Sequence, residues 1–158
     1  MAEKLDQIDR KIVTELMRDA TQSVAQIADR VGLSQTPCWK RIQKLEQTGV
    51  LVKRVALADP DKLGFGLTVF AGIEAPDHSA EWRDAFAAAL KKLPQVMESY
   101  RMAGEMDYLL RVVVADMAAF DSFYKQLTDM VSIKNFTSHF AMERMSFTTA
   151  YPVDTQTR

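Results

Sequence analysis

The chain has 158 residues, of which 47 % are hydrophobic and 26 % charged, with a formal net charge of −1. This length suits one domain or two small ones, and the apolar content is sufficient for packed cores. No run approaches the roughly 18 apolar residues that cross a bilayer, and the first residues are polar and charged, which excludes a membrane span and a secretory signal. Cys38 is the only cysteine, so no internal disulfide can form, as is typical of a cytosolic protein of bacteria.

The first third of the chain predicts two helices in succession. Asp6 is a plausible N-cap for the first, whose apolar residues recur at helical spacing as Leu5, Ile8, Ile12 and Leu16. Ser23 and Gln26 form a capping box for the second, which carries Val24, Ile27, Ala28 and Val31. Gly32 stands where a glycine ends a helix in the left-handed conformation.

A third helix follows after a turn of about three residues. Ser34 is a good N-cap, and Pro37 falls in the first turn, where a missing amide donor costs no helical hydrogen bond. A helix, a short turn and a second helix at this spacing indicate a helix-turn-helix. After it, residues 49–55 resemble a turn and a short basic strand, as in a wing.

The third helix separates its chemistry by face. Cys38, Ile42 and Leu45 form an apolar stripe, while amide, hydroxyl, cationic and indole groups occupy the other side. Such groups suit base edges and phosphates, although a solvated surface helix would carry many of them too. The candidate DNA-binding residues are Ser34, Gln35, Thr36, Trp39, Lys40, Arg41 and Lys44. Arg41 lies at the edge of the apolar stripe and could contact the DNA backbone or pair within the domain.

Charge is distributed unevenly along the chain. Residues 30–54 hold six cations and a single anion, Glu46, whereas residues 61–158 hold ten cations and thirteen anions. A basic segment joined to an acidic body is the asymmetry expected of a DNA-binding regulator.

The second half predicts strand, helix, strand and then the same order again. The strands are expected at 67–73, 96–103, 108–114 and 136–143, and the helices contain Trp82 to Leu93 and Phe120 to Leu127. Asp77 or Ser79 would cap the first helix and Asp116 the second. This order is the split βαβ, ferredoxin-like arrangement. Two helices cover one face of such a sheet, so pairing with a second copy would cover the other and gives a dimer.

We therefore expect an α+β chain with a winged helix-turn-helix followed by a ferredoxin-like βαββαβ domain. The boundary is placed in the Pro- and Gly-containing segment 59–66. Residues 1–60 would form the DNA-binding domain and linker, and residues 61–158 the effector-binding and oligomerisation domain.

The turn at 102–108 could bind a small molecule. Gly104 permits a close backbone approach with exposed amides, and Glu105 and Asp107 add carboxylates. A zwitterionic amino acid needs amides that bind its carboxylate and, beside them, a carboxylate that binds its ammonium. This turn offers both. An ordinary hairpin turn stabilised by the aspartate is the alternative. Neither a metal-ligand spacing nor a cofactor loop or catalytic constellation is found, and His139 beside Ser138 is better explained as a polar lining residue.

The chain resembles the leucine-responsive regulatory protein/AsnC family of transcription regulators from about Leu5 to Pro152. The matching stretches are LDQID, Ile27-Ala28, Gly32-Leu33-Ser34, TPCWKRIQKLEQTGV, AGEMDYLLRVVVAD and TSHFAMERMSFTT. Within the family, TPCWKR, Ser79 to Trp82 and Arg101 to Glu105 are similar to the subgroup of a cysteine-responsive regulator of cysteine desulfidation.

The resemblance implies a dimer formed through the sheets, often assembling further to tetramers or octamers, and an effector amino acid bound between dimers. The family's glycine and aspartate of the site match Gly104 and Asp107, and the strand matching residues 137–139 would come from a neighbouring subunit. The implied effector residues are Met102, Gly104, Glu105, Met106, Asp107, Tyr108, Thr137, Ser138 and His139.

The sequence thus predicts a cytoplasmic, nucleoid-associated regulator that binds specific double-stranded DNA and responds to a small amino acid, without cofactor, metal or membrane partner. An architectural protein that wraps DNA with little effector response is the alternative. An enzyme on the ferredoxin-like dimer has little support, since it would leave the basic helix unexplained.

Overall fold

The computed structural model describes residues 5–155, which divide into two compact units. One unit, the helical unit, comprises residues 5–57 together with the returning segment 145–155. The other, the sheet unit, comprises residues 58–144. This division differs from the predicted assignment of residues 61–158 to a single domain, because residues 145–155 group with the N-terminal helices.

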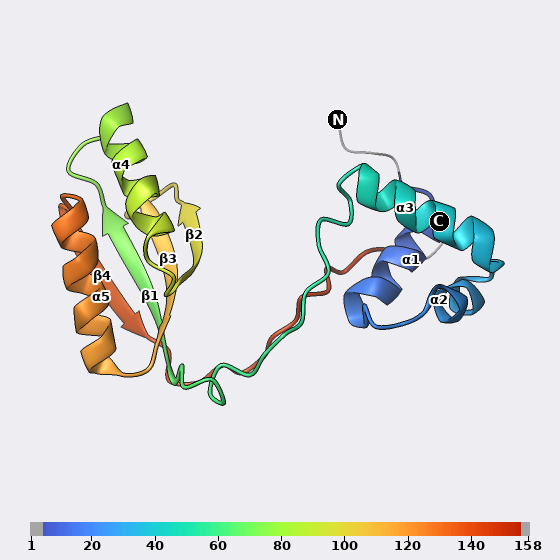
Figure 1. Ribbon diagram of the computed structural model, residues 1–158. Coiled ribbons are helices and arrows are strands. Elements are labelled where there is room, and N and C mark those ends of the chain that lie inside the picture. Colours follow the sequence, from blue (N-terminus) through green and yellow to red (C-terminus); the bar gives the residue numbers. More distant parts are fainter. Residues whose placement is uncertain (1–4, 156–158) are drawn as a thin grey trace. The chain divides into compact units, whose positions relative to one another are not determined.

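The helical unit contains the three predicted helices, α1 (Gln7–Arg18), α2 (Val24–Val31) and α3 (Gln35–Gln47) (Figure 1). Asp6 and Ser23 cap α1 and α2 through reciprocal capping boxes, and Gly32 ends α2 at φ 75°. Ser34 has the extended backbone of an N-cap, but its side chain makes no capping bond. The apolar stripes meet in one core of Ile12, Val13, Leu16, Ile27, Ala28, Val31, Cys38, Ile42 and Leu45.

The predicted strand of a wing at residues 49–55 is wrong. The chain turns at Gly49, where its amide donates to Glu46 O, and the Leu51 amide returns to Leu45 O. Residues 52–57 then continue without strand pairing. A strand needs a neighbour for its backbone groups, and no described strand lies beside this segment within the unit. Arg54 instead pairs with Glu46 at 2.7 Å.

The sheet unit has the predicted strand and helix order. Its elements are β1 (Leu67–Glu74), α4 (Ala80–Lys91), β2 (Val96–Arg101), β3 (Tyr108–Val114), α5 (Met117–Met130) and β4 (Asn135–Phe140). The strand order β2-β3-β1-β4, with every pair antiparallel, is that of the ferredoxin-like fold. Strand β4 ends at Phe140 rather than residue 143, and β2 ends at Arg101 rather than residue 103.

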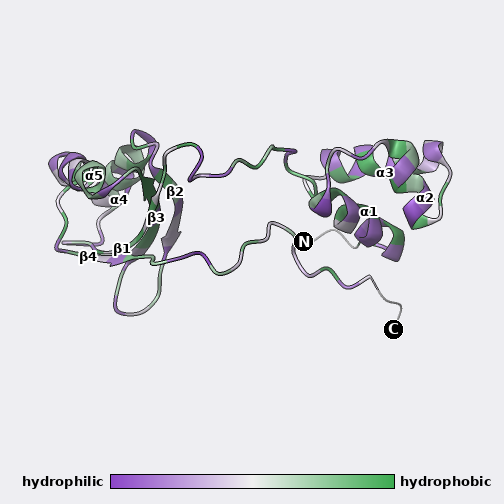
Figure 2. Cartoon of the chain, turned by 90° about the horizontal axis from the view of Figure 1, so that it is seen from below, coloured by the Kyte–Doolittle hydropathy of each residue, from purple (hydrophilic) through white to green (hydrophobic). Residues whose placement is uncertain are grey.

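Helices α4 and α5 cover one face of this sheet (Figure 2). The alternate residues Val69, Ala71 and Ile73 of β1 are fully buried beneath them, with Phe86 and Phe123 among the helix residues they meet. The opposite side, here called the open face, carries Thr68, Phe70, Leu109, Arg111 and Val113. Phe70 remains 38 % exposed there, and Arg111 pairs with Glu98, so the open face is a mixed apolar and charged surface without a helix, as the sequence predicted for its cover.

Candidate nucleic-acid interface and ligand site

Helix α3 presents two distinct faces in the structure. Cys38, Ile42 and Leu45 are at most 2 % exposed, which confirms the apolar stripe. The side that the sequence assigned to DNA is open, with exposed residues Ser34, Gln35, Thr36, Trp39, Lys40 and Lys44. Trp39 keeps 51 % of its surface exposed, so its indole is accessible to a partner.

Arg41 forms two ion pairs within the helical unit. Its Nη1 lies 2.6 Å from Asp6 Oδ2 and 2.7 Å from Asp9 Oδ1. The amide of Asp9 is the main cause that lowers the pKa of Asp6, and Arg41 lowers it further. Of the two roles left open for Arg41, the structure shows pairing within the domain, which joins α3 to the start of α1.

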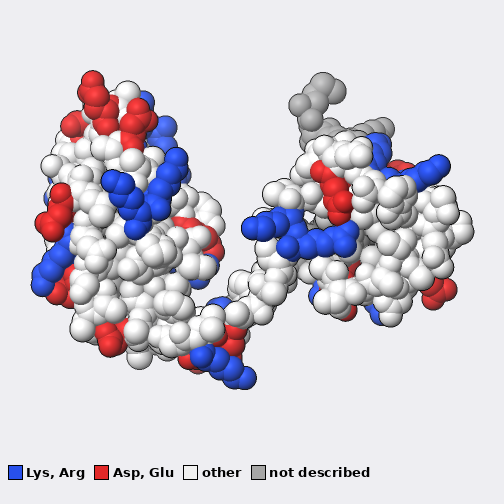
Figure 3. Space-filling model, in the orientation of Figure 1, with Lys and Arg blue, Asp and Glu red and all other residues white. Residues whose placement is uncertain are grey.

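Basic side chains lie on the surface of the helical unit (Figure 3). Arg30 pairs with Glu15 at 2.9 Å and Arg54 with Glu46 at 2.7 Å, so part of the positive charge is held by carboxylates of the same unit. Lys40 and Lys44 lie on the exposed side of α3 that also carries Gln35 and Trp39. The cations of α3 thus stand where they can meet an anionic polymer.

The predicted ligand turn joins β2 to β3. Gly104 has φ 137°, a conformation that glycine adopts far more readily than other residues. The turn is closed by the Met102 amide donating to Asp107 O at 2.8 Å, and the Asp107 amide donates to Ile73 O at 2.9 Å. Residues 102–105 are exposed and residues 106–108 half-buried, so this loop is fixed at its base and open at its tip.

The Asp107 side chain already has a structural partner. Its Oδ2 accepts a hydrogen bond from the Ala75 amide at 2.8 Å, which joins the turn to the end of β1. Its Oδ1 lies 3.9 Å from His78 Nδ1. One oxygen of the carboxylate therefore orders the turn through Ala75, while the other lies near His78. Sequence reasoning missed Ala75 and His78, since neither forms a motif with Asp107.

Met106 lies against Gly72 in the middle of β1. A Cβ at Gly72 would stand 3.2 Å from Met106 Sδ, closer than ordinary packing. Thr137 is opposite Gly72 in the β1–β4 register. Because Gly72 has no side chain, Met106 fills the space beside it. This space lies between the turn 102–108 and β4, the strand that carries the other predicted ligand residues.

The remaining ligand candidates divide between the two faces of the sheet. Tyr108 packs on the helix side, with its ring centroid 4.8 Å from that of Phe86. Ser138 is opposite the buried Ala71 and shares that side. Thr137 and His139 are exposed and lie on the open face. Within one subunit the structure therefore brings Met106 and Thr137 to the open face and places Tyr108 and Ser138 beneath the helices.

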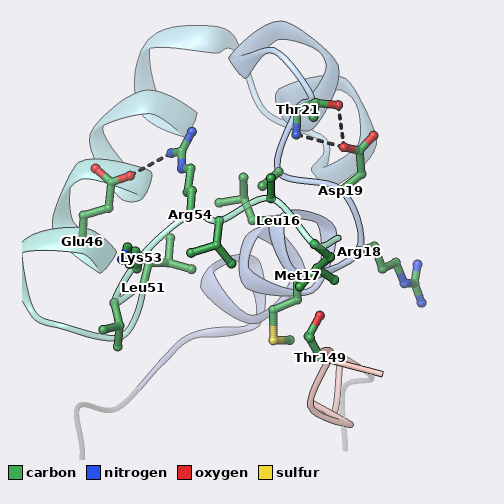
Figure 4. A pocket seen from close by; sticks show the side chains of 15 residues that line it. Leu16, Met17, Arg18, Asp19, Thr21, Glu46, Leu51, Lys53, Arg54 and Thr149 are labelled. Carbon is green, nitrogen blue, oxygen red and sulfur yellow. Dashed lines mark hydrogen bonds and ion pairs between the residues drawn. The ribbon is translucent and has the colours of Figure 1, made fainter. Parts of the chain in front are cut away.

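A groove of about 650 Å³ lies within the helical unit (Figure 4). Leu16 and Met17 of α1 line it with residues 51–57, and Thr149 of the returning segment closes one side. Its polar groups are mostly occupied, since Arg54 bonds Glu46 and Asp19 bonds Thr21. The groove marks the place where three segments of this unit meet.

Other chemistries find no support in the described residues. No group of three or more His, Cys, Asp or Glu residues among residues 5–155 could hold a metal ion. Cys38 is buried, and burial raises the pKa of its thiol. No helix in the described part of the chain is long and apolar enough to cross a membrane.

Comparison with known proteins identifies the two regions of the chain by family. Residues 5–46 match the AsnC-type helix-turn-helix domain, and residues 68–151 match the Lrp/AsnC ligand binding domain. The chain belongs to the Lrp/AsnC family. It is a DNA-binding transcription regulator with a ligand-binding C-terminal domain, in a family of regulators rather than enzymes.

Individual relatives extend over nearly the whole chain. The DNA-binding transcriptional activator DecR of Escherichia coli strain K12 is 47 % identical over 151 residues, which are 95 % of this chain and 99 % of DecR. The crystal structure of an AsnC family transcriptional regulator from Agrobacterium tumefaciens has a TM-score of 0.91 and 49 % identity, covering 94 % of this chain and 97 % of that one. A Neisseria meningitidis transcriptional regulator in complex with L-Met has a TM-score of 0.91 and 30 % identity, covering 96 % and 98 %.

Proposed function

We propose that this regulator reads double-stranded DNA with the exposed face of α3. Gln35, Thr36 and Trp39 would lie nearest to base edges, while Lys40 and Lys44 meet phosphates. The observation that carries the proposal is the clean separation of α3 into a buried apolar stripe and an exposed side with amide, hydroxyl, indole and cationic groups. Ser34 is the exposed N-cap of α3, beside these residues.

In this proposal Arg41 contributes indirectly. Its guanidinium is shared between Asp6 and Asp9, at 2.6 and 2.7 Å. A charge held by two carboxylates is poorly placed to neutralise a phosphate as well. Arg41 therefore sets the position of α3, and the direct contacts fall to the residues around it.

We further propose that the effector is an amino acid bound at the turn 102–108. Its carboxylate would dock on amides around Gly104 and Glu105, and Asp107 would hold the ammonium directly or by ordering the turn. The fixed base and exposed tip of this turn support the proposal. So does the L-Met complex of the Neisseria meningitidis relative. The resemblance to the cysteine-responsive subgroup, together with 47 % identity to DecR, makes cysteine the first effector to test.

The assembly that we propose is a homodimer formed through the open faces of two sheets, in the cytoplasm on nucleoid DNA. Phe70 and Tyr100 are 38 % and 52 % exposed on or beside this face, an apolar surface that a second copy would cover. A dimer also presents two copies of α3 to a symmetric operator. Further assembly to a tetramer or octamer would bring Thr137, Ser138 and His139 of a neighbouring subunit to the turn.

A footprint on DNA upstream of neighbouring genes, with and without amino acids, tests the function. We expect a protected site whose extent or spacing changes with one amino acid, because a ligand that binds between subunits shifts assembly. The alternative is an architectural protein that wraps DNA, for which protection would spread without sequence preference and no amino acid would alter it.

A further inference from the structure

The first turns of α1 are contacted from two sides, by α3 and by the segment that returns from the sheet unit. We propose that residues 153–155 position α3, here called the reading helix, by holding the first turns of α1 in place. The inference rests on the proposed DNA surface of α3 and adds to it a part of the chain far from α3 in sequence.

The returning segment is bound by two side chains of α1. Gln7 Nε2 donates to Thr155 O at 3.0 Å, and Arg10 Nη1 donates to Asp154 O at 3.3 Å. Val153 and Thr155 are half-buried. Both acceptors are backbone carbonyls, so the side chains of Gln7 and Arg10 select the path of this segment, whichever residues it carries there.

The same turns of α1 hold the reading helix. Asp6 and Asp9 bind Arg41 of α3, and the Asp9 amide donates to Asp6 Oδ1 at 2.8 Å. Residues 6, 7, 9 and 10 follow one another within a turn and a half of helix. A change in the position of this part of α1 therefore moves the anchor of Arg41, and Asp9 cannot adapt freely because it is 8 % exposed.

Loss of this support has a recognisable consequence for DNA binding. Hydrogen bonds to base edges require the side chains of α3 in an accurate position, whereas attraction between Lys40 or Lys44 and phosphates depends weakly on geometry. A displaced α3 thus loses preference for its operator while its general affinity for DNA persists. If residues 153–155 only stabilised the helical unit, their loss would not change the ratio between the affinities for operator DNA and for unrelated DNA in the folded protein.

The test compares four full-length or shortened proteins. They are the wild type, the chain ended at Pro152, Gln7→Ala, and Gln22→Ala as the matched control. Gln22 also donates hydrogen bonds to α1 and its C-cap, at Glu15 O and Asp19 O, but to no described residue of the returning segment. Each protein is titrated with a duplex that the wild type selects from a random-sequence pool and with an unrelated duplex of equal length, at several salt concentrations and below its melting temperature.

We expect the shortened chain and Gln7→Ala to lower the affinity ratio between the two duplexes by roughly three- to tenfold, the effect of one or two lost hydrogen bonds. The salt slope stays unchanged because the lysines of α3 remain. Gln22→Ala lowers the melting temperature without changing the ratio. An unchanged ratio in both altered proteins, or an equal fall in Gln22→Ala, overturns the inference.

Lys44→Ala distinguishes this inference from the proposed function. It removes a phosphate contact, so it weakens binding to both duplexes and lowers the salt slope by about one. If Lys44→Ala changes neither, the proposed surface of α3 is wrong. If Lys44→Ala behaves as expected but the shortened chain keeps the wild-type ratio, only the positioning role fails.

Discussion

Replacing Asp107 by asparagine separates the two roles proposed for its carboxylate. Oδ2 accepts the Ala75 amide at 2.8 Å in a partly buried position. A hydrogen bond to a charged group contributes about 1.5–3 kcal/mol, so Asp107→Ala should cost roughly 2 kcal/mol even without ligand. Since 1 kcal/mol shifts the melting temperature of a domain of this size by about 4–8 °C, that loss is about 8–16 °C. Asp107→Asn keeps an oxygen for Ala75 and should lose much less.

Asp107→Asn should keep most of the stability of the fold but lose most of the stabilisation that the ligand provides. An amino acid at a hundred times its dissociation constant stabilises the wild type by about 2.7 kcal/mol. Asp107→Asn lacks the negative charge for the ammonium, so this shift should largely vanish although the fold is intact. The assay is a thermal melt of each protein against the twenty amino acids, with cysteine kept reduced.

Asp77→Asn is the matched control for this melt. Asp77 follows the same end of β1, and its carboxylate accepts the Ser79 amide at 2.8 Å rather than a group of the turn. We expect it to keep the wild-type response. An undiminished ligand shift in Asp107→Asn would refute the reasoning, because the carboxylate would then not hold the ammonium.

Three further predictions concern Lys44 of α3, Phe70 of the open face and Asp6 at the start of α1. Lys44→Ala should reduce the salt slope of DNA binding by about one in gel-shift titrations, and an unchanged slope and affinity would remove it from the interface. Phe70→Glu places a charge on the open face and should convert the dimer to a monomer in light scattering at micromolar concentration; a persistent dimer would assign pairing to another surface. The pKa of Asp6 is lowered from 3.8 by the Asp9 amide and Arg41, so its contribution to stability is present above that value and is lost as the pH falls through the folded pKa. Melts below about pH 4 should therefore fall more steeply for the wild type than for Asp6→Asn, and parallel curves would contradict this.

Local signals in the sequence were sufficient for the helices and for the order of the strands. Asp6, Ser23 and Asp116 each cap the helix predicted for them, and Gly32 ends α2 in the left-handed region. These devices involve residues within four positions of one another, so they can be recognised without knowing the fold. The alternation along β1 likewise predicted that Phe70 and its neighbours on the open face would lack helix cover.

The parts that sequence reasoning missed depend on partners distant in the chain. Residues 49–55 have strand-like composition but no neighbouring strand, and composition does not reveal that absence. The sequence left two roles open for Arg41, and only its carboxylate partners Asp6 and Asp9 favour pairing within the domain. The sequence offered Asp107 either as a ligand contact or as a stabiliser of the turn, but it did not reveal that the carboxylate accepts a backbone amide 32 residues away. Backbone acceptors such as Thr155 O leave no trace in residue identity.

The helical unit is built from two separate stretches of the chain, residues 5–57 and 145–155, and this has a consequence for protein synthesis. Its three helices leave the ribosome before the sheet unit, but residues 145–155 follow only after the entire sheet unit has been made. At about 5–20 residues per second, several seconds separate Leu57 from Thr155. During that time the nascent α1 carries Gln7 and Arg10 without their carbonyl partners. The helices can form their own core early, whereas the finished arrangement of the unit must await residues 145–155.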